Sequence, residues 1–150
     1  IASGKVITGF NIIRNVALGA DMVNSARGMM MALGCIQALE CNKNICPTGI
    51  ATQNPELMKG LVVEDKSIRV ANYHRETVHS VIDLLSATGH NSIEELTRYD
   101  MNRRISQMSV RRFDEIYPII PAGSFLNGDI PNNLINDFTL SSENHFIPST

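Results

Sequence analysis

The sequence predicts an α/β fold with parallel strands, because helical and strand-like patterns alternate along its first part. The first helix is expected between Thr8 and Gly19. Thr8 is a suitable N-cap, apolar residues follow at helical spacing, and Gly19 occupies a typical C-terminal position. Residues 20–24 predict a short buried strand. A small-residue turn then leads into a second apolar helix, expected over residues 26–39.

A loop and a long helix are expected next. Pro47 and Gly49 oppose helix formation, so residues 40–56 are predicted to form a loop. Apolar residues then recur every three or four positions over residues 65–88, which predicts a long helix that ends at Gly89.

The C-terminal third changes in composition. Residues 92–95 have the pattern of a capping box and predict a short helix, and another helix is expected over residues 110–117. From Pro121 onward Gly, Pro, Asn, Asp and Ser dominate. We therefore expect a domain over residues 1–120 and an extended or partly disordered tail over residues 121–150.

Composition excludes several classes of function. Of 150 residues, 43% are hydrophobic and 19% charged, which is typical of a globular domain with a core. The net charge of -2 gives no electrostatic case for nucleic acid as the main partner. No apolar run reaches the roughly 20 residues of a membrane span. No signal-peptide pattern opens the chain, and the cysteine usage suits a reducing cytosol, so a cytoplasmic protein is expected. Because residue 1 is Ile, we expect a C-terminal fragment of a longer protein.

Two turns have the features of a phosphate site. Ser3, Gly4 and Lys5 precede the first predicted helix. The turn before the second helix consists of Asn24, Ser25, Ala26 and Arg27. Helix N-termini attract phosphate, small residues allow it to approach the backbone, and Lys5 and Arg27 add charge. Either turn alone is also a common helix start with a solvated cation. In this order, however, they match the last two units of a (β/α)8 barrel, whose phosphate site follows its seventh and eighth strands.

All three cysteines of the chain lie in one short window, as Cys35, Cys41 and Cys46, with the spacing C-x5-C-x4-C. Three thiolates suit an iron–sulfur cluster that lacks one iron. Structural zinc sites usually take four protein ligands, and the closest histidine, His74, is distant in sequence. The alternative is that the cysteines are buried small hydrophobic residues, which is plausible for Cys35 in its apolar stretch.

The motifs ASGKVITGF, ALGADMVNSARG and GCIQALECNKNICPTGIATQ carry a resemblance to a known family. Over about residues 2–120 the chain resembles the FMN-binding synthase domain of glutamate synthases, and more closely the stand-alone FMN-binding glutamate synthase family. The run CPTGIATQ after GCIQALEC is its most specific signature. The chain departs from the family pattern at Lys5, where a second glycine is usual, and at residues 24–27, where a Gly-Phe-Gly-Thr-like run is usual.

This resemblance implies the C-terminal portion of a (β/α)8 barrel, followed by helices and the tail. It implies FMN, with its phosphate held at residues 3–5 and 24–27, and a 3Fe-4S cluster ligated by the three cysteines. Electrons from a donor protein or subunit would pass through the cluster to FMN. The flavin would then reduce 2-iminoglutarate, formed from 2-oxoglutarate and ammonia or glutamine-derived nitrogen, to L-glutamate. Catalytic residues are expected upstream of residue 1, so the catalytic residues stay unknown.

Two other functions fit the same residues. One is a different flavin- or phosphate-binding barrel in which the cysteines are structural. The other is a non-catalytic interaction module. A homo-oligomer is compatible with these two functions and with the oxidoreductase. Because two strands of an eight-stranded barrel leave exposed edges, we also expect the chain alone to fold poorly, dimerise or aggregate.

Overall fold

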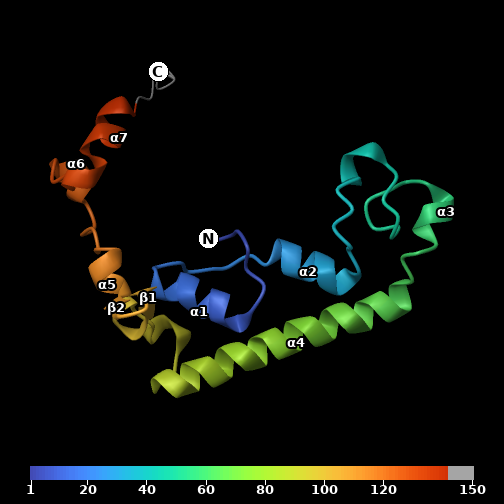
Figure 1. Ribbon diagram of the computed structural model, residues 1–150, viewed down its shortest axis with the longest axis horizontal. Helices are drawn as coiled ribbons and strands as arrows, with labels where there is room; N and C mark the ends of the chain where they lie inside the picture. The colour runs from blue at the N-terminus through green and yellow to red at the C-terminus, as the bar shows by residue number, and fades with distance from the viewer. Residues whose placement is uncertain (142–150) are drawn as a thin grey trace. The chain divides into compact units, whose positions relative to one another are not determined.

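The computed structural model describes residues 1–141, which fall into two compact units, one over residues 1–116 and one from residue 117 onward (Figure 1). The first unit opens with a parallel bridge between Ala2 and Val23. The Ala2 amide donates to the Met22 carbonyl at 2.8 Å, and the Asn24 amide donates to the Ala2 carbonyl at 2.8 Å. The expected parallel pairing is therefore present over one residue from each segment.

The prediction of a buried strand at residues 20–24 is wrong. Val23 takes part in the bridge, but no strand extends from it, and Met22 is 62% exposed. Parallel strands are stable when both faces are covered and neighbours pair on their edges. Among residues 1–141, Ala2 is the one residue paired with this segment. The fold is thus compatible with part of an α/β protein, and residues 1–141 form no barrel.

Helix α1 (Gly9–Ala17) connects the two bridged segments and agrees with the predicted first helix. Thr8 forms a capping box with Asn11: the Thr8 hydroxyl accepts from the Asn11 amide, and the Asn11 side chain accepts from the Thr8 amide at 3.2 Å. Gly19 follows the helix in the left-handed region, with φ +108°. The predicted cap and stop are both confirmed.

Helix α2 (Ala26–Leu33) begins where the sequence predicts but ends six residues before the expected position 39. Gly34 takes the left-handed conformation, φ 113°, and its amide bonds the Met31 carbonyl at 3.0 Å. A glycine in this conformation terminates a helix because it closes the last turn at no steric cost. Cys35 consequently lies outside the helix.

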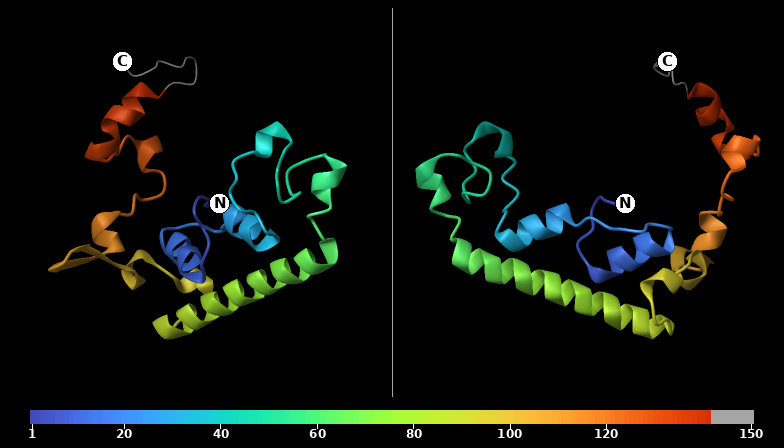
Figure 2. Two further views of the ribbon diagram at one scale, coloured as in Figure 1. Left: turned by 45° about the vertical axis from the view of Figure 1, so that its right-hand side comes forward. Right: turned by 180° about the vertical axis from the view of Figure 1, so that it is seen from behind.

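Helix α4 (Val63–Thr88) confirms the predicted long helix and its stop at Gly89, which has φ +80°. It runs along both α1 and α2 (Figure 2). Gly9 allows the close approach to α1, because an added Cβ there would lie 2.7 Å from Ser80 Oγ and 2.9 Å from the Val81 amide nitrogen. The helix therefore holds the two shorter helices together.

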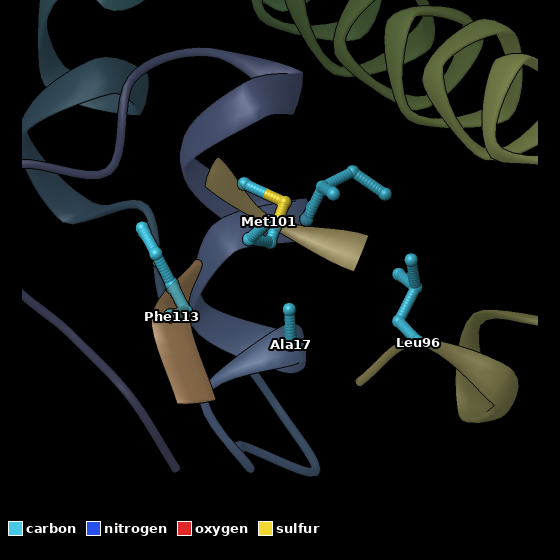
Figure 3. Close-up of a cluster of buried hydrophobic side chains, with 5 residues drawn as sticks. Ala17, Leu96, Met101 and Phe113 are labelled. Carbon is cyan, nitrogen blue, oxygen red and sulfur yellow. The ribbon is translucent and has the colours of Figure 1, made fainter. Parts of the chain in front are cut away.

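The main core lies where the C-terminal half of the first unit covers α1. Its buried members come from α1, from the segment after α4 and from the start of α5 (Figure 3); they are Ile13, Ala17, Leu96, Met101 and Phe113. Side chains of α4, including Val81, Leu84 and Leu85, pack against this cluster. Burial of these residues supplies the hydrophobic stabilisation of the unit.

The segment after α4 contains two 3-10 helices, η2 (Ile93–Glu95) and η3 (Arg98–Asp100). The short helix expected at residues 92–95 is η2. Its predicted capping box is incomplete. The Ser92 hydroxyl accepts a hydrogen bond from the Glu94 amide instead of the Glu95 amide, and the Glu95 carboxylate accepts one from the Asn91 amide instead of the Ser92 amide.

An antiparallel hairpin follows, formed by β1 (Asn102–Ser106) and β2 (Ser109–Arg112), before helix α5 (Phe113–Ile116). The prediction of a helix over residues 110–117 is wrong in its first part, because residues 110–112 belong to β2. The helix covers residues 113–116. The Phe113 amide donates to the Met101 carbonyl at 2.9 Å, and this bond lies at the base of the hairpin, beside the core. The chain enters α5 directly after the hairpin.

Polar side-chain contacts hold this segment in place. The carboxylates of Asp100 and Glu95 lie 3.0 and 3.4 Å from the two ring nitrogens of His90. Partial burial alone would raise the pKa of Asp100, but hydrogen bonds from Thr97 and the neighbouring His90 outweigh it, so this pKa lies below its ordinary value of 3.8. Arg98 joins the segment to α1 by donating to the Leu18 carbonyl at 3.1 Å.

The second unit is helical in its described part, with α6 (Ser124–Asn127), η4 (Asn132–Leu134) and α7 (Ile135–Leu140). The Phe125 and Phe138 rings pack with centroids 5.6 Å apart. Up to residue 141 the expected extended tail is therefore folded into short helices, because its scattered aromatic residues pack on one another. The rest of that predicted tail, residues 142–150, lies outside the described residues. Within residues 1–141, no helix is both long and apolar enough to cross a membrane.

We expect Ile13→Ala to lower the free energy of unfolding by about 2–5 kcal/mol, because it opens a cavity in the core on α1. Ile13 is 2% exposed, whereas Phe10 on the same helix is 48% exposed. Denaturant unfolding of the intact protein that carries this sequence measures the change. Phe10→Ala is the matched control, and an equal loss in both variants would contradict the assigned core.

The lowered pKa of Asp100 predicts a loss of stability in acid. Since the folded-state pKa lies below 3.8, the contribution is present above that pH and disappears as the pH falls through the folded-state value. We expect Asp100→Asn to be less stable than the wild type near neutral pH, and the two unfolding free energies to converge in acid. Asp83→Asn, at an exposed position of α4, is the control. A difference that stays constant with pH would refute the assignment.

Candidate cofactor-binding site

The parallel bridge brings the two predicted phosphate turns to one edge of the first unit. Residues 3–5 directly follow Ala2, and residues 24–27 directly follow its partner Val23. Because both segments run in the same direction, whatever follows each of them emerges at the same end. Two turns that are far apart in the sequence therefore adjoin, and together they form the candidate anion site.

The first turn has an unusual backbone. Gly4 has φ +97° and Lys5 has φ 54°, so two consecutive residues take the left-handed conformation. For Lys5 this conformation costs about 1–2 kcal/mol, because its Cβ crowds the next carbonyl. Ser3, Gly4 and Lys5 are all exposed, and no atom lies within 4 Å of where a Gly4 Cβ would stand. Open space thus lies beside the backbone of this turn.

The second turn leaves the start of α2 uncapped. Ser25 is the N-cap residue, but its hydroxyl makes no capping bond to α2 and instead donates to the Val6 carbonyl at 2.7 Å. The first turn of α2 contains no acidic residue, and Arg27 is exposed there. Unpaired amides, a positive helix end and a nearby cation favour an anion at this position.

Tyr73 of α4 also reaches this region, and no pattern in the sequence indicates it. Its hydroxyl donates to the Ile7 carbonyl at 2.5 Å, a contact between residues far apart in the chain. The one local hint is Gly28 in the first turn of α2, where a side chain would collide with the Tyr73 hydroxyl.

The cysteine loop follows α2 and contains η1 (Cys41–Lys43) and α3 (Pro55–Met58). Asn44, with φ 61°, closes the loop: its side-chain oxygen accepts from the Gln53 amide at 2.5 Å, and its carbonyl accepts from the Thr52 hydroxyl at 2.7 Å. Gly49 packs so closely that an added Cβ would lie 2.3 Å from the Leu57 carbonyl oxygen. The loop is thus locally well defined around its third cysteine.

The three thiols differ in environment. Cys41 is exposed, Cys35 is half-buried and accepts a 3.4 Å hydrogen bond from the Gln37 amide, and Cys46 is buried. The Thr48 hydroxyl lies 3.4 Å from Cys46 Sγ, and backbone amides of Ala51 and Thr48 also bond this sulfur. These hydrogen bonds lower the pKa of Cys46 to about 7, against the opposing effect of burial. The thiolate, the form that ligates metals, is therefore stabilised at Cys46.

Among residues 1–141, no three His, Cys, Asp or Glu side chains lie close enough together to hold a metal ion. The donor set suits an iron–sulfur cluster chemically, because all three candidates are thiols on one loop and one of them favours its thiolate. Ligation of a cluster by Cys35, Cys41 and Cys46 remains a prediction.

Comparison with known proteins identifies the family. A family model described as the conserved region in glutamate synthase matches residues 1–91, which contain both turns and all three cysteines. The chain belongs to the glutamate synthase family, as the resemblance predicted.

Similar proteins carry the same family name. Over 115 residues, 77% of this chain and 22% of the relative, it is 43% identical to the glutamate synthase large subunit-like protein YerD of Bacillus subtilis. Over 96 residues, 64% of this chain and 19% of the relative, it is 44% identical to the archaeal glutamate synthase (NADPH) of Methanocaldococcus jannaschii. The glutamate synthase (NADPH) large chain of Bacillus subtilis is 32% identical over 62% of this chain and 6% of its own length. The chain thus spans about a fifth or less of these relatives.

We expect Thr48→Val to raise the pKa of Cys46 from about 7 toward 9.0, because it removes the side-chain hydrogen bond that contributes most to the lowered value. The measurement is the pH dependence of thiolate ultraviolet absorbance, in cluster-free protein whose Cys35 and Cys41 are replaced by serine. Thr52→Val is the control, since Thr52 bonds Asn44 instead of the thiol. An unchanged midpoint in Thr48→Val would show that the hydroxyl does not act on Cys46.

Proposed function

We propose that this chain contributes the phosphate end of an FMN site and an iron–sulfur-binding loop to a glutamate synthase-like oxidoreductase. The observation that carries the proposal is the Ala2–Val23 bridge. It gathers the turns at residues 3–5 and 24–27 at one end of the unit, within the region that the family model matches. Each turn alone is common, but their convergence on open space suits a phosphate group.

The residues of the two turns have distinct roles in this proposal. Backbone amides at Ala26 and Arg27, at the uncapped start of α2, would donate to the phosphate. Gly4 keeps the first turn free of a side chain, and the cations of Lys5 and Arg27 add attraction. The hydroxyl of Ser25 is committed to the Val6 carbonyl, so Ser25 would act through its backbone. The flanking Ser3 and Asn24 complete the set.

The cysteine loop would hold the 3Fe-4S cluster through Cys35, Cys41 and Cys46. Cys46 is the best-prepared ligand, because its buried thiol already receives hydrogen bonds that favour the thiolate. Cys35 follows the Gly34 stop of α2, and Cys41 begins η1, so both lie on backbone outside long helices. Cluster assembly would order these two segments, since ligand binding and local folding are coupled.

The whole protein's reaction is proposed to be the reduction of 2-iminoglutarate to L-glutamate. Condensation of 2-oxoglutarate with ammonia, supplied free or from glutamine, forms the imine and releases water. Bound FMN would supply a hydride to the imine carbon, a proton would go to nitrogen, and the cluster would return electrons from a donor protein or subunit. This chain's part is to bind and orient the cofactors.

A second candidate is a flavin- or phosphate-binding protein of the same fold whose cysteines are structural. One observation favours it: in the described residues the three sulfurs form no metal-holding group. The visible spectrum separates the two candidates, because a flavin alone lacks the broad absorbance of an iron–sulfur cluster.

We expect Cys46→Ser and Cys41→Ser to abolish the brown chromophore and the bound iron of the intact protein after anaerobic reconstitution with iron and sulfide, because each removes a required thiolate. Iron and sulfide analysis and the visible spectrum provide the measurement. Asn42→Ser, an exposed polar change beside Cys41, is the control and should retain the cluster. Full iron content in both cysteine variants would overturn the cluster assignment and leave the second candidate.

A further inference from the structure

Two side chains from different helices fasten consecutive carbonyls next to the first turn. Ser25, at the start of α2, donates to the Val6 carbonyl at 2.7 Å, and Tyr73, on α4, donates to the Ile7 carbonyl at 2.5 Å. Val6 itself is 2% exposed, so this point of the segment is anchored by burial as well. The other side of the turn is fixed by the Ala2–Val23 bridge. The exposed turn at residues 3–5 is therefore held on both sides.

Gly28 shows how closely these groups meet. An added Cβ at this buried glycine would lie 2.2 Å from the Tyr73 hydroxyl oxygen and 2.6 Å from Ser25 Oγ. Since φ of Gly28 is not in the left-handed region, the backbone does not require glycine here. The absence of a side chain instead lets the Tyr73 ring pass the first turn of α2 and reach Ile7. A tyrosine on α4 thus ties together both turns of the candidate site.

We propose that Tyr73 is the positioning residue of the flavin phosphate site, and that its hydrogen bond to Ile7 sets the first turn in register with the start of α2. This inference rests on the proposed function. Tyr73 does not touch the phosphate; it acts through the backbone of residues 3–7. A preorganised turn binds its anion more tightly than a mobile one, because less conformational entropy is lost on binding. Tyr73 is half-buried, and its bond to Ile7 joins α4 to a segment 66 positions away in the sequence.

The test compares two flavins that differ only in the phosphate. Cofactor-stripped intact protein that carries this sequence is titrated with FMN and with riboflavin, and binding is followed by quenching of flavin fluorescence. For Tyr73→Phe we expect the FMN dissociation constant to rise about tenfold, the effect of losing one well-placed hydrogen bond, and that of riboflavin to stay unchanged. Ser25→Ala, which removes the parallel bond to Val6, should have the same selective effect.

Tyr99→Phe is the matched control, because it removes the same hydroxyl from a tyrosine on η3, whose ring lies 5.2 Å from the Arg112 guanidinium. It should bind both flavins as the wild type does. An unchanged FMN affinity in both Tyr73→Phe and Ser25→Ala overturns the positioning role. An equal loss of FMN and riboflavin binding overturns it too, since that would indicate general loosening of the fold. Equal affinity of the wild type for the two flavins would instead refute the proposed phosphate site itself.

Discussion

The pairing of Ala2 with Val23 is the constraint on which the first unit depends. Parallel pairing cannot be closed by a tight turn, so the chain between the two residues must cross over, and α1 is that crossover. The crossover helix then needs a cover for its apolar side, which α4 and the segment around Leu96 and Met101 provide. Because the paired segments run in the same direction, the chemistry of the chain gathers at the end where both of them stop.

Helix α4 serves both the fold and the candidate site. Its C-terminal half approaches α1 through the space that Gly9 leaves, and Tyr73, near its middle, reaches the turn at residues 3–5 through the backbone of Ile7. A ligand bound at the turns would therefore stabilise the packing of α4, since binding to the folded state shifts the folding equilibrium. The same contact explains why Gly28, which is not needed for backbone reasons, is a glycine.

Much of the candidate site could be predicted from local sequence, and its assembly could not. The number and spacing of Cys35, Cys41 and Cys46 predict a thiolate-ligated site. The two turns can be predicted because small residues precede helices there. The environment of each thiol depends on which groups fold over its sulfur, and at Cys46 the Thr48 hydroxyl and nearby backbone amides stabilise the thiolate. The role of Tyr73 depends on a contact across most of the unit, and no periodicity in the sequence encodes it.

By itself, the sequence determined the caps and stops of the helices, because Thr8, Gly19 and Gly89 act on their immediate neighbours. It also determined the family, through the motifs around the cysteines. Tertiary structure decided the hairpin at residues 102–112, whose exposed, arginine-rich strands lack the alternation that marks a half-buried strand. It also decided that residues 20–24 pair at a single point, since a strand persists only where neighbours satisfy its backbone and cover its faces.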